Sequence, residues 1–365
     1  MAVTGVRVPI AFSTIFNKLR LDPYKICMRK NHKNSFQKRI FSGIQPTSIP
    51  HVGNYFGAVK SWVDLQNDQK ENIILSIVDL HSITVPQNPA RLQQQIEESL
   101  ICLIASGIDP NRTVLFQQSK VNGHASLSWI LGCLCTIPQL EHLPQWKEKS
   151  ELVKESRLGI FTYPVLQAAD ILLYKATHVP VGEDQVKHIE LTRHLAKAFN
   201  RTYLNIFPSP QTILGKHKRI KSLRNPANKM SKSEADSKGK IDICDSAEEI
   251  VQKVKKAVTD SNSAITYDPI ERPGISNLIE IMSAVTDTEP NRIVENSAGL
   301  DTVQFKSRVS EAVVEYFRPI RKRFIELRED RSYLHKVLKD GEEKAQKIAD
   351  ETMHEVRNAV GLNVY

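Results

Sequence analysis

The stretch Ile40-Phe41-Ser42-Gly43-Ile44 sets the interpretation of the fold, and it runs into a polar turn with a proline, Gln45-Pro46-Thr47-Ser48. A short, mainly apolar run bounded by turn residues is typical of a buried strand. After Gly53 the apolar side chains recur at helical spacing, so a helix is expected directly behind the turn. The folded part is therefore predicted to begin with a strand, a turn and a helix.

The same order repeats downstream. Ile73–Leu80 is a second apolar run of strand length, and Thr113–Gln117 is a third. Between them, Pro89–Ser106 is predicted to be a helix, with proline in its first turn and Gly107 after its end. Strands that alternate with helices pair in parallel through right-handed crossovers. The sequence therefore predicts an α/β fold with a parallel sheet, and ligands in such sheets bind at the carboxyl ends of the strands.

The remaining elements suggest a second, helical part. Two helices are expected in an insertion, over Ala125–Leu134 and Gln139–Trp146, and Val179–Gln185 is expected to be a strand end that leads into another helix. The segment Gly215–Ser237 is rich in Lys, Ser, Asn and Pro and is predicted to be a loop with little order of its own. The capping box Ser246–Glu249 opens a helix beyond it.

Two long helices are expected near the C-terminus. One is Gly341–Val360, and the other carries a single apolar stripe made of Phe305, Val309, Val313, Phe317, Ile320 and Phe324. We therefore predict a Rossmann-like catalytic domain at residues 38–236 with an inserted helical segment, followed by an all-helical C-terminal domain at residues 237–365.

Charge is concentrated at the N-terminus. The chain of 365 residues has a net charge of +9, but nine Lys and Arg and a single acid, Asp22, lie within residues 1–39, so this segment carries +8 and the rest only +1. A basic, acid-poor segment with hydroxyl and apolar residues is typical of a mitochondrial transit peptide, predicted here at residues 1–37. The alternatives are a basic RNA-binding arm or a chain without fixed structure. Because the rest is nearly neutral, the overall charge is poor support for nucleic-acid binding.

The composition argues against membrane-spanning, disulfide-rich and metal-binding proteins. No run of about 18 apolar residues is present, so no membrane-spanning helix is expected. The five cysteines are odd in number and form no Cys-x-x-Cys pair. Neither a disulfide framework nor a protein-held metal site is therefore predicted.

A polar segment, Asn228-Lys229-Met230-Ser231-Lys232-Ser233, has the composition of a loop that closes over a polyphosphate. Its ammonium groups, hydroxyls and backbone N–H groups could all bind phosphate oxygens. A solvated loop is the ordinary alternative. A second candidate is His51-Val52-Gly53-Asn54 at a predicted helix start, where the helix N-terminus adds positive potential and glycine allows close approach.

Asp170 is the most informative single residue, because the segment around it is otherwise apolar. Burying a carboxylate costs several kcal/mol unless it is paired. Asp170 is therefore either an internal cap or ion pair, or an acceptor for a ligand N–H at the floor of a pocket. Similarly, Glu183 and Asp184 could simply open a helix, whereas Gln185 could reach a substrate.

Taken together, these segments resemble the class I aminoacyl-tRNA synthetases, and in particular the tryptophanyl-tRNA synthetase family of the bacterial and mitochondrial type. The downstream lysine-serine loop matches the family at all five positions from Lys229 to Ser233, and the upstream motif has Asn54 where many members have a second histidine. Six further motifs agree in order: Ile44–Thr47, Ile77–His81, Thr162–Pro164, Ala168–Tyr174, Val179–Gln185 and Ala257–Asp260. The resemblance extends from about Arg39 to the C-terminus.

The resemblance implies three sets of site residues. Tryptophan would be bound by Phe41, His81, Tyr163, Gln167, Asp170, Val179, Val181 and Gln185. ATP would be bound by Gln45, His51, Gly53, Asn54, Gly182, Asp184, Lys229, Met230, Ser231 and Lys232. The catalytic set would be Lys149, Lys229, Lys232 and Ser233. The chain departs from the family at Ser48, usually Gly, and at Gln167, often Met in bacterial members, which puts an amide beside the pocket.

The resemblance also implies a reaction and partners. Tryptophan would be activated with ATP to tryptophanyl-adenylate and transferred to tRNA(Trp) in the mitochondrial matrix, with Mg²⁺ accompanying ATP and a homodimer as the assembly. Contacts with tRNA phosphates are expected from Arg318, Arg321 and Lys322, for which a solvated helix face is the alternative.

Other functions stay open at this point. A tyrosyl-tRNA synthetase would share the fold and both phosphate motifs. A catalytically inactive RNA-binding homologue should show broken motifs, whereas both lysines of the loop are intact here. A nucleotidyltransferase that does not act on tRNA should lack the long helical C-terminal part.

Overall fold

The computed structural model describes residues 36–68, 72–144, 146, 157–215, 220–231 and 236–363. By its internal contacts the chain divides into Met1–Ser35 and Phe36–Tyr365. The first unit, and with it nearly all of the predicted transit segment, lies outside the described residues.

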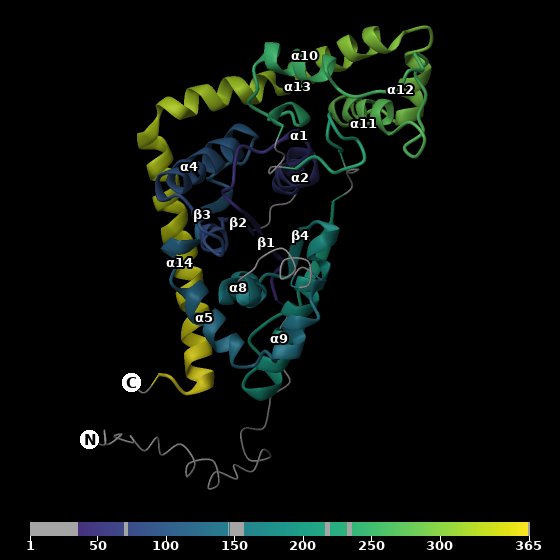
Figure 1. The fold of residues 1–365 in the computed structure, drawn as a ribbon. Helices are drawn as coiled ribbons and strands as arrows, with labels where there is room; N and C mark the ends of the chain where they lie inside the picture. The colour runs from purple at the N-terminus through teal and green to yellow at the C-terminus, as the bar shows by residue number, and fades with distance from the viewer. Residues whose placement is uncertain are drawn as a thin grey trace, which may run out of the picture. The chain divides into compact units, whose positions relative to one another are not determined.

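A parallel sheet organises this unit, as the alternation of strands and helices predicts (Figure 1). The strand order is β3-β2-β1-β4-β5, and every neighbouring pair is parallel. The strands are β1 (Arg39–Ile44), β2 (Asn72–Ile77), β3 (Thr113–Gln117), β4 (His178–Val181) and β5 (Gln211–Leu214). The order changes direction between β1 and β4, which is the position where open α/β sheets bind ligands.

The helices fall into those of the sheet region and those of the C-terminal part. The first set comprises α1 (Val52–Asn54), the π-helix η1 (Tyr55–Val59), α2 (Lys60–Asp68), α3 (Asp79–Ser82), α4 (Pro89–Ala105), the 3-10 turn η2 (Gln118–Lys120), α5 (Gly123–Gly132), α6 (Ile137–Glu141), α8 (Leu158–Leu173), the 3-10 turn η3 (Glu183–Gln185) and α9 (Val186–Thr202). The second set comprises η4 (Ser237–Gly239), α10 (Ala247–Lys255), α11 (Pro273–Thr286), α12 (Pro290–Asn296), α13 (Thr302–Glu329) and α14 (Arg331–Val360).

Alternate residues of the strands face two hydrophobic cores, as the two-residue period of a strand requires. Ile73 and Leu75 of β2 belong to one core, which also holds apolar side chains of α2, α4, α10, α11 and α13. Ile74 of β2 belongs to the other, with side chains of α5, α8 and α9. Because α10, α11 and α13 share a core with the sheet, the boundary predicted at 236/237 stays a prediction.

The last helix connects both cores past the edge of the sheet. Leu334 of α14 packs in the first core and Ala349 in the second, and between them α14 contacts β3 (Figure 1, yellow). At the crossing point a Cβ on Gly341 would lie 1.8 Å from the carbonyl oxygen of Leu115. Glycine at this position therefore lets α14 cover the otherwise open edge strand.

Several predicted boundaries need correction. The long helix begins at Arg331 rather than Gly341, because Gly341 is a packing position inside it. The helix predicted over Gln139–Trp146 ends at Glu141. The second strand ends at Ile77, because Asp79 accepts hydrogen bonds from the Ser119 backbone N–H (2.9 Å) and the Gln117 side chain (2.8 Å) and begins a helical turn. No helix among the described residues is long and apolar enough to cross a membrane.

Candidate active site

A cavity of about 550 Å³ lies at the carboxyl ends of β1 and β4. Every residue expected to bind tryptophan lines it: Phe41, His81, Tyr163, Gln167, Asp170, Val179, Val181 and Gln185. Four of the residues expected to bind ATP line it too, namely Gln45, Asn54, Gly182 and Asp184. The structure thus brings together residues that are up to 144 positions apart, from Phe41 to Gln185.

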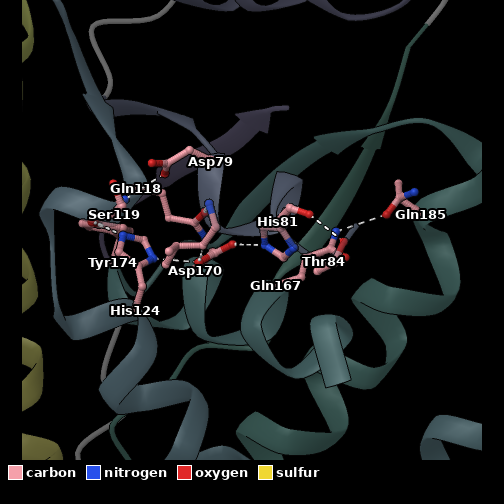
Figure 2. Close-up of polar contacts among 11 residues, drawn as sticks. Asp79, His81, Thr84, Gln118, Ser119, His124, Gln167, Asp170, Tyr174 and Gln185 are labelled. Carbon is pink, nitrogen blue, oxygen red and sulfur yellow. Dashed lines mark hydrogen bonds and ion pairs between the residues drawn. The ribbon is translucent and has the colours of Figure 1, made fainter. Parts of the chain in front are cut away.

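Asp170 lies at the cavity wall with only 2% of its surface exposed, and donors surround its carboxylate (Figure 2). Oδ1 accepts from Nε2 of Gln118 and from Nδ1 of His124, each at 2.7 Å. Oδ2 accepts from Nε2 of His81 at 2.8 Å. Asp170 is therefore paired internally and also lines the cavity, and its role as an acceptor for a ligand N–H stays a prediction.

The surroundings of Asp170 keep it ionised. Burial alone would raise the pKa of its carboxyl, but the hydrogen bonds from His124 and His81 and their electrostatic attraction outweigh burial and lower that pKa below its ordinary value. Burial raises the pKa of the Tyr174 hydroxyl far above its usual range, and the negative charge of Asp170 is the second cause of this shift. The Tyr174 hydroxyl therefore stays protonated and can donate a hydrogen bond to Nε2 of His124, 2.8 Å away. With Nε2 as the acceptor, the ring proton of His124 is on Nδ1, which faces Asp170.

A second polar network lies across the cavity. Oε1 of Gln185 accepts from Nε2 of Gln167 at 3.2 Å and from Nδ1 of the buried His188 at 2.9 Å. The other ring nitrogen of His188 lies 3.2 Å from the Tyr163 hydroxyl. The amide of Gln167 thus contacts another pocket side chain and helps to fix it.

The helix start at His51 differs in detail from the expectation. Nδ1 of His51 accepts the backbone N–H of Asn54 at 3.2 Å, and Oδ1 of Asn54 accepts the backbone N–H of His51 at 3.4 Å. The two residues therefore form a reciprocal cap. Asn54 lines the cavity, whereas His51 is 1% exposed and does not, so in this structure Nδ1 of His51 is engaged in the cap and cannot donate to a phosphate.

The lysine-serine loop is described only in its first part. Lys229 is exposed and forms an antiparallel bridge with Lys221, while Met230 is buried in the first core. This pairing gives residues 220–231 more order than the composition predicts. Neither Lys229 nor Met230 nor Ser231 lines the cavity. Gly53 does not line it either, and the predicted residues Lys149, Lys232 and Ser233 lie outside the described residues.

The predicted tRNA contacts divide into two kinds. Arg318 and Lys322 are exposed on α13, and Arg318 pairs with Glu315 on the same helix. Arg321 instead donates from Nη1 to the backbone carbonyl of Asp245 at 2.8 Å, which ties α13 to the start of α10. Arg321 therefore has a structural contact that composition did not indicate.

Sequence reasoning missed Gln118 and His124, although both contact Asp170. Neither belongs to the matched motifs, and no periodic pattern marks either one, since Gln118 stands in the polar run Gln117–Lys120. The available signal was positional, since Gln118 directly follows the predicted strand Thr113–Gln117 and thus lies at the carboxyl end of the sheet. Within the described residues, no group of three or more His, Cys, Asp or Glu side chains could hold a metal ion.

Comparison with known proteins settles the family. The family model described as tRNA synthetases class I (W and Y) matches residues 33–318. The chain belongs to this family. The mitochondrial tryptophan–tRNA ligase of Schizosaccharomyces pombe is 42% identical over 347 residues, which cover 90% of this chain and 96% of that protein. The Caenorhabditis elegans mitochondrial tryptophan–tRNA ligase is 45% identical over 329 residues, which cover 88% and 91%.

A solved structure supports the same family assignment. The tryptophanyl-tRNA synthetase from Campylobacter jejuni complexed with ADP and tryptophan has a TM-score of 0.78 at 32% identity, and the match covers 89% of this chain and 100% of that one. The resemblance drawn from the separate motifs is confirmed, as are the α/β fold and the assignment to the aminoacyl-tRNA synthetases.

Proposed function

We propose that this class I synthetase activates tryptophan with ATP and transfers it to tRNA(Trp). In the first step a carboxylate oxygen of tryptophan attacks the α-phosphorus of ATP, and pyrophosphate leaves. In the second, a hydroxyl of the terminal ribose of tRNA attacks the carbonyl carbon, and AMP leaves. No protein nucleophile is required, so the protein acts by positioning and by stabilising charge.

The observation that carries the choice of tryptophan is the buried, ionised Asp170 at the wall of the cavity. A carboxylate offers about four acceptor positions, and three are taken by Gln118, His124 and His81. Among the donors that the described residues supply, these three are the contacts of the carboxylate, and the position that they leave is on Oδ2, the oxygen shared with His81. An indole ring supplies a single N–H at its edge, which matches one remaining acceptor position.

ATP is proposed to bind at the neighbouring end of the same cavity. Gln45, Asn54, Gly182 and Asp184 line it there, and Asn54 belongs to the first turn of the helical run that begins at Val52, where the helix N-terminus adds positive potential. Mg²⁺ would arrive on the phosphates, since this ion is commonly held by substrate phosphates and waters with few protein ligands. The lysines of the 229–233 loop and Lys149 would then neutralise the charge that develops on pyrophosphate.

Tyrosine is the competing substrate to exclude. Its hydroxyl could also donate to Asp170, so rejection must come from shape. The ring of Phe41 and the side chains of Val179 and Val181 line the space that indole would fill, and a six-membered ring would fill less of it. The supporting relatives named above are tryptophan–tRNA ligases, which favours the same choice.

Replacing Asp170 with Asn tests the proposal. The new NH₂ group must face either the donors of Gln118 and His124 or those of His81 and the substrate, so a donor meets a donor in either orientation. We expect tryptophan-dependent ATP–pyrophosphate exchange to fall by about 100-fold or more, the scale of losing a charge-assisted hydrogen bond, while ATP binding persists. Asp79→Asn is the matched control, because Asp79 is also buried between donors but does not line the cavity. Normal tryptophan kinetics in the Asp170 variant, or better activation of tyrosine by the wild type, would contradict the proposal.

Contact with tRNA is proposed for the exposed face of α13. Because Arg321 holds Asp245, the informative variant is Arg318→Ala with Lys322→Ala. We expect it to weaken tRNA binding and to reduce the slope of log affinity against log salt by about 1–2, as when one or two phosphate contacts are lost, with tryptophan activation unchanged. Lys336→Ala with Lys339→Ala removes the same charge from exposed positions on α14 and should leave binding nearly unchanged. If both double variants weakened tRNA binding equally, the effect would come from the net charge of the protein, and the proposed contact at α13 would be wrong.

The mitochondrial matrix is proposed as the location. The basic N-terminal segment and the mitochondrial relatives support it. Isolated mitochondria should import the full chain and process it, whereas a chain that begins at Phe36 should stay outside. Import of the shortened chain at the same rate would show that the segment is not the signal.

A homodimer is proposed from an exposed apolar face. Trp129 on α5 is 77% exposed, Cys133 at the end of α5 is also exposed, and Ile137 at the start of α6 is 64% exposed. Exposed large apolar groups of this kind commonly mark interfaces. Sedimentation equilibrium should give about twice the chain mass of 41.3 kDa, and Trp129→Glu should shift it toward the monomer. A wild-type monomer at micromolar concentration would refute the proposal.

A further inference from the structure

Two side chains that do not line the cavity complete the hydrogen bonding of Asp170. Gln118 and His124 both donate to Oδ1 at 2.7 Å, and both are fully buried. They come from different connections, Gln118 from the turn after β3 and His124 from the first turn of α5. Oδ1 therefore already has two donors, which is about all that one carboxylate oxygen can accept.

The close approach of α5 to α8 makes the His124 contact possible. A Cβ on Gly123 would lie 3.1 Å from the methyl carbons of Leu173 and 3.4 Å from Cβ of Ala349. Glycine before His124 thus lets the start of α5 pack tightly on α8, which carries Asp170. The imidazole is further fixed by stacking on Phe116, with ring centroids 5.8 Å apart.

The orientation of each donor is set by a further partner. Oε1 of Gln118 accepts the backbone N–H of Leu80 at 3.1 Å, so the NH₂ end of this amide must face Asp170. Nε2 of His124 contacts the Tyr174 hydroxyl at 2.8 Å, so Nδ1 faces Asp170 (Figure 2). Neither side chain can turn its donor away without leaving a buried polar group unpaired, which is costly.

We propose that Gln118 and His124 are positioning residues for the amino-acid substrate: by saturating Oδ1 they leave one oxygen, Oδ2, at a fixed place as the acceptor for the ring N–H. The inference rests on the proposed function, since it concerns the acceptor for indole. The competing account is that the two side chains only fill the core. The two accounts differ in what happens when the donor is moved while a polar side chain of similar size is kept.

A matched pair of substitutions separates them. The amide nitrogen of Asn can take the place of Nδ1, so His124→Asn can keep the donor to Asp170 and loses the contact with Tyr174. The amide of Gln lies nearer the place of Nε2, so His124→Gln keeps a partner for Tyr174 and loses the donor to Asp170. Loss of packing alone predicts the larger defect in the smaller Asn variant, and positioning predicts it in the Gln variant.

The measurement is the ratio of kcat/KM for tryptophan to that for β-(3-benzothienyl)alanine, in which sulfur replaces the ring N–H, by ATP–pyrophosphate exchange. Sites that bind a substrate N–H discriminate strongly against analogues that lack it. We expect His124→Gln to reduce this ratio by about 10-fold or more, mainly through KM for tryptophan, because the contact exists in ground and transition states alike. His124→Asn should stay within about threefold of the wild type, and KM for ATP should not change.

The outcomes are separable. Equal ratios in the two variants, or a larger loss in the Asn variant, would overturn the inference. If His124→Gln does not fold, Gln118→Met carries the test, because it removes the other donor to Oδ1 at similar volume and should lower the same ratio, and an unchanged ratio would overturn the inference. A wild-type enzyme that does not activate tryptophan would overturn the proposed function itself, and one without preference for tryptophan over the analogue would overturn Asp170 as the acceptor for the ring N–H. A preference kept in the folded His124→Gln variant would overturn only the positioning role.

Discussion

A carboxylate that is 98% buried governs the arrangement of this structure, because Asp170 can stay ionised there only if donors reach it from several sides. The donors come from three separate places: His81 from the turn after β2, Gln118 from the turn after β3 and His124 from α5. A parallel sheet brings the carboxyl ends of neighbouring strands to one edge, so these connections can meet at Asp170 of α8. The topology thus makes the buried charge tolerable, and the charge in turn fixes how the connections pack.

Much of the sheet could be predicted because β1, β2 and β3 are mainly apolar runs of strand length: β1 and β2 lie inside the sheet, and α14 covers the edge strand β3. The strand Thr113–Gln117 has the predicted bounds, and the first strand differs by one residue. β5 was not predicted, since Gln211–Leu214 is short, exposed at both ends and lies at the sheet edge, where no second core imposes an apolar run. The start of α14 was misplaced for a related reason: Gly341 suggests a helix boundary locally, but contact with the Leu115 carbonyl requires it inside the helix. Tertiary contacts of this kind leave no local pattern in the sequence.

In the candidate site, too, some residues could be predicted from sequence motifs and others depend on tertiary contacts. Residues that touch the cavity could be named because the family resemblance implies them, and all eight expected for tryptophan line it. The residues behind them could not, since Gln118 and His124 matter only through the distance to Asp170 that folding creates. His51 shows the same limit, because its motif position does not reveal that Nδ1 caps the helix in this structure, and its role toward ATP stays a prediction. A motif therefore identifies which residues gather at a site, while the partner of each side chain follows from the packed structure.

The wall of the cavity and the acceptor within it form one connected unit. Phe41, which lines the cavity, stacks on Tyr174 with ring centroids 5.5 Å apart and planes 10° apart. The hydroxyl of Tyr174 contacts His124, and His124 donates to Asp170. A change in the aromatic wall would thus shift both the space available to a substrate ring and the oxygen that accepts its N–H. Discrimination between indole and a phenol ring then depends on shape and hydrogen bonding together, because a ring that fits the wall poorly also presents its donor at the wrong depth. Such coupling allows a single carboxylate, which by itself would accept either donor, to contribute to the choice between them.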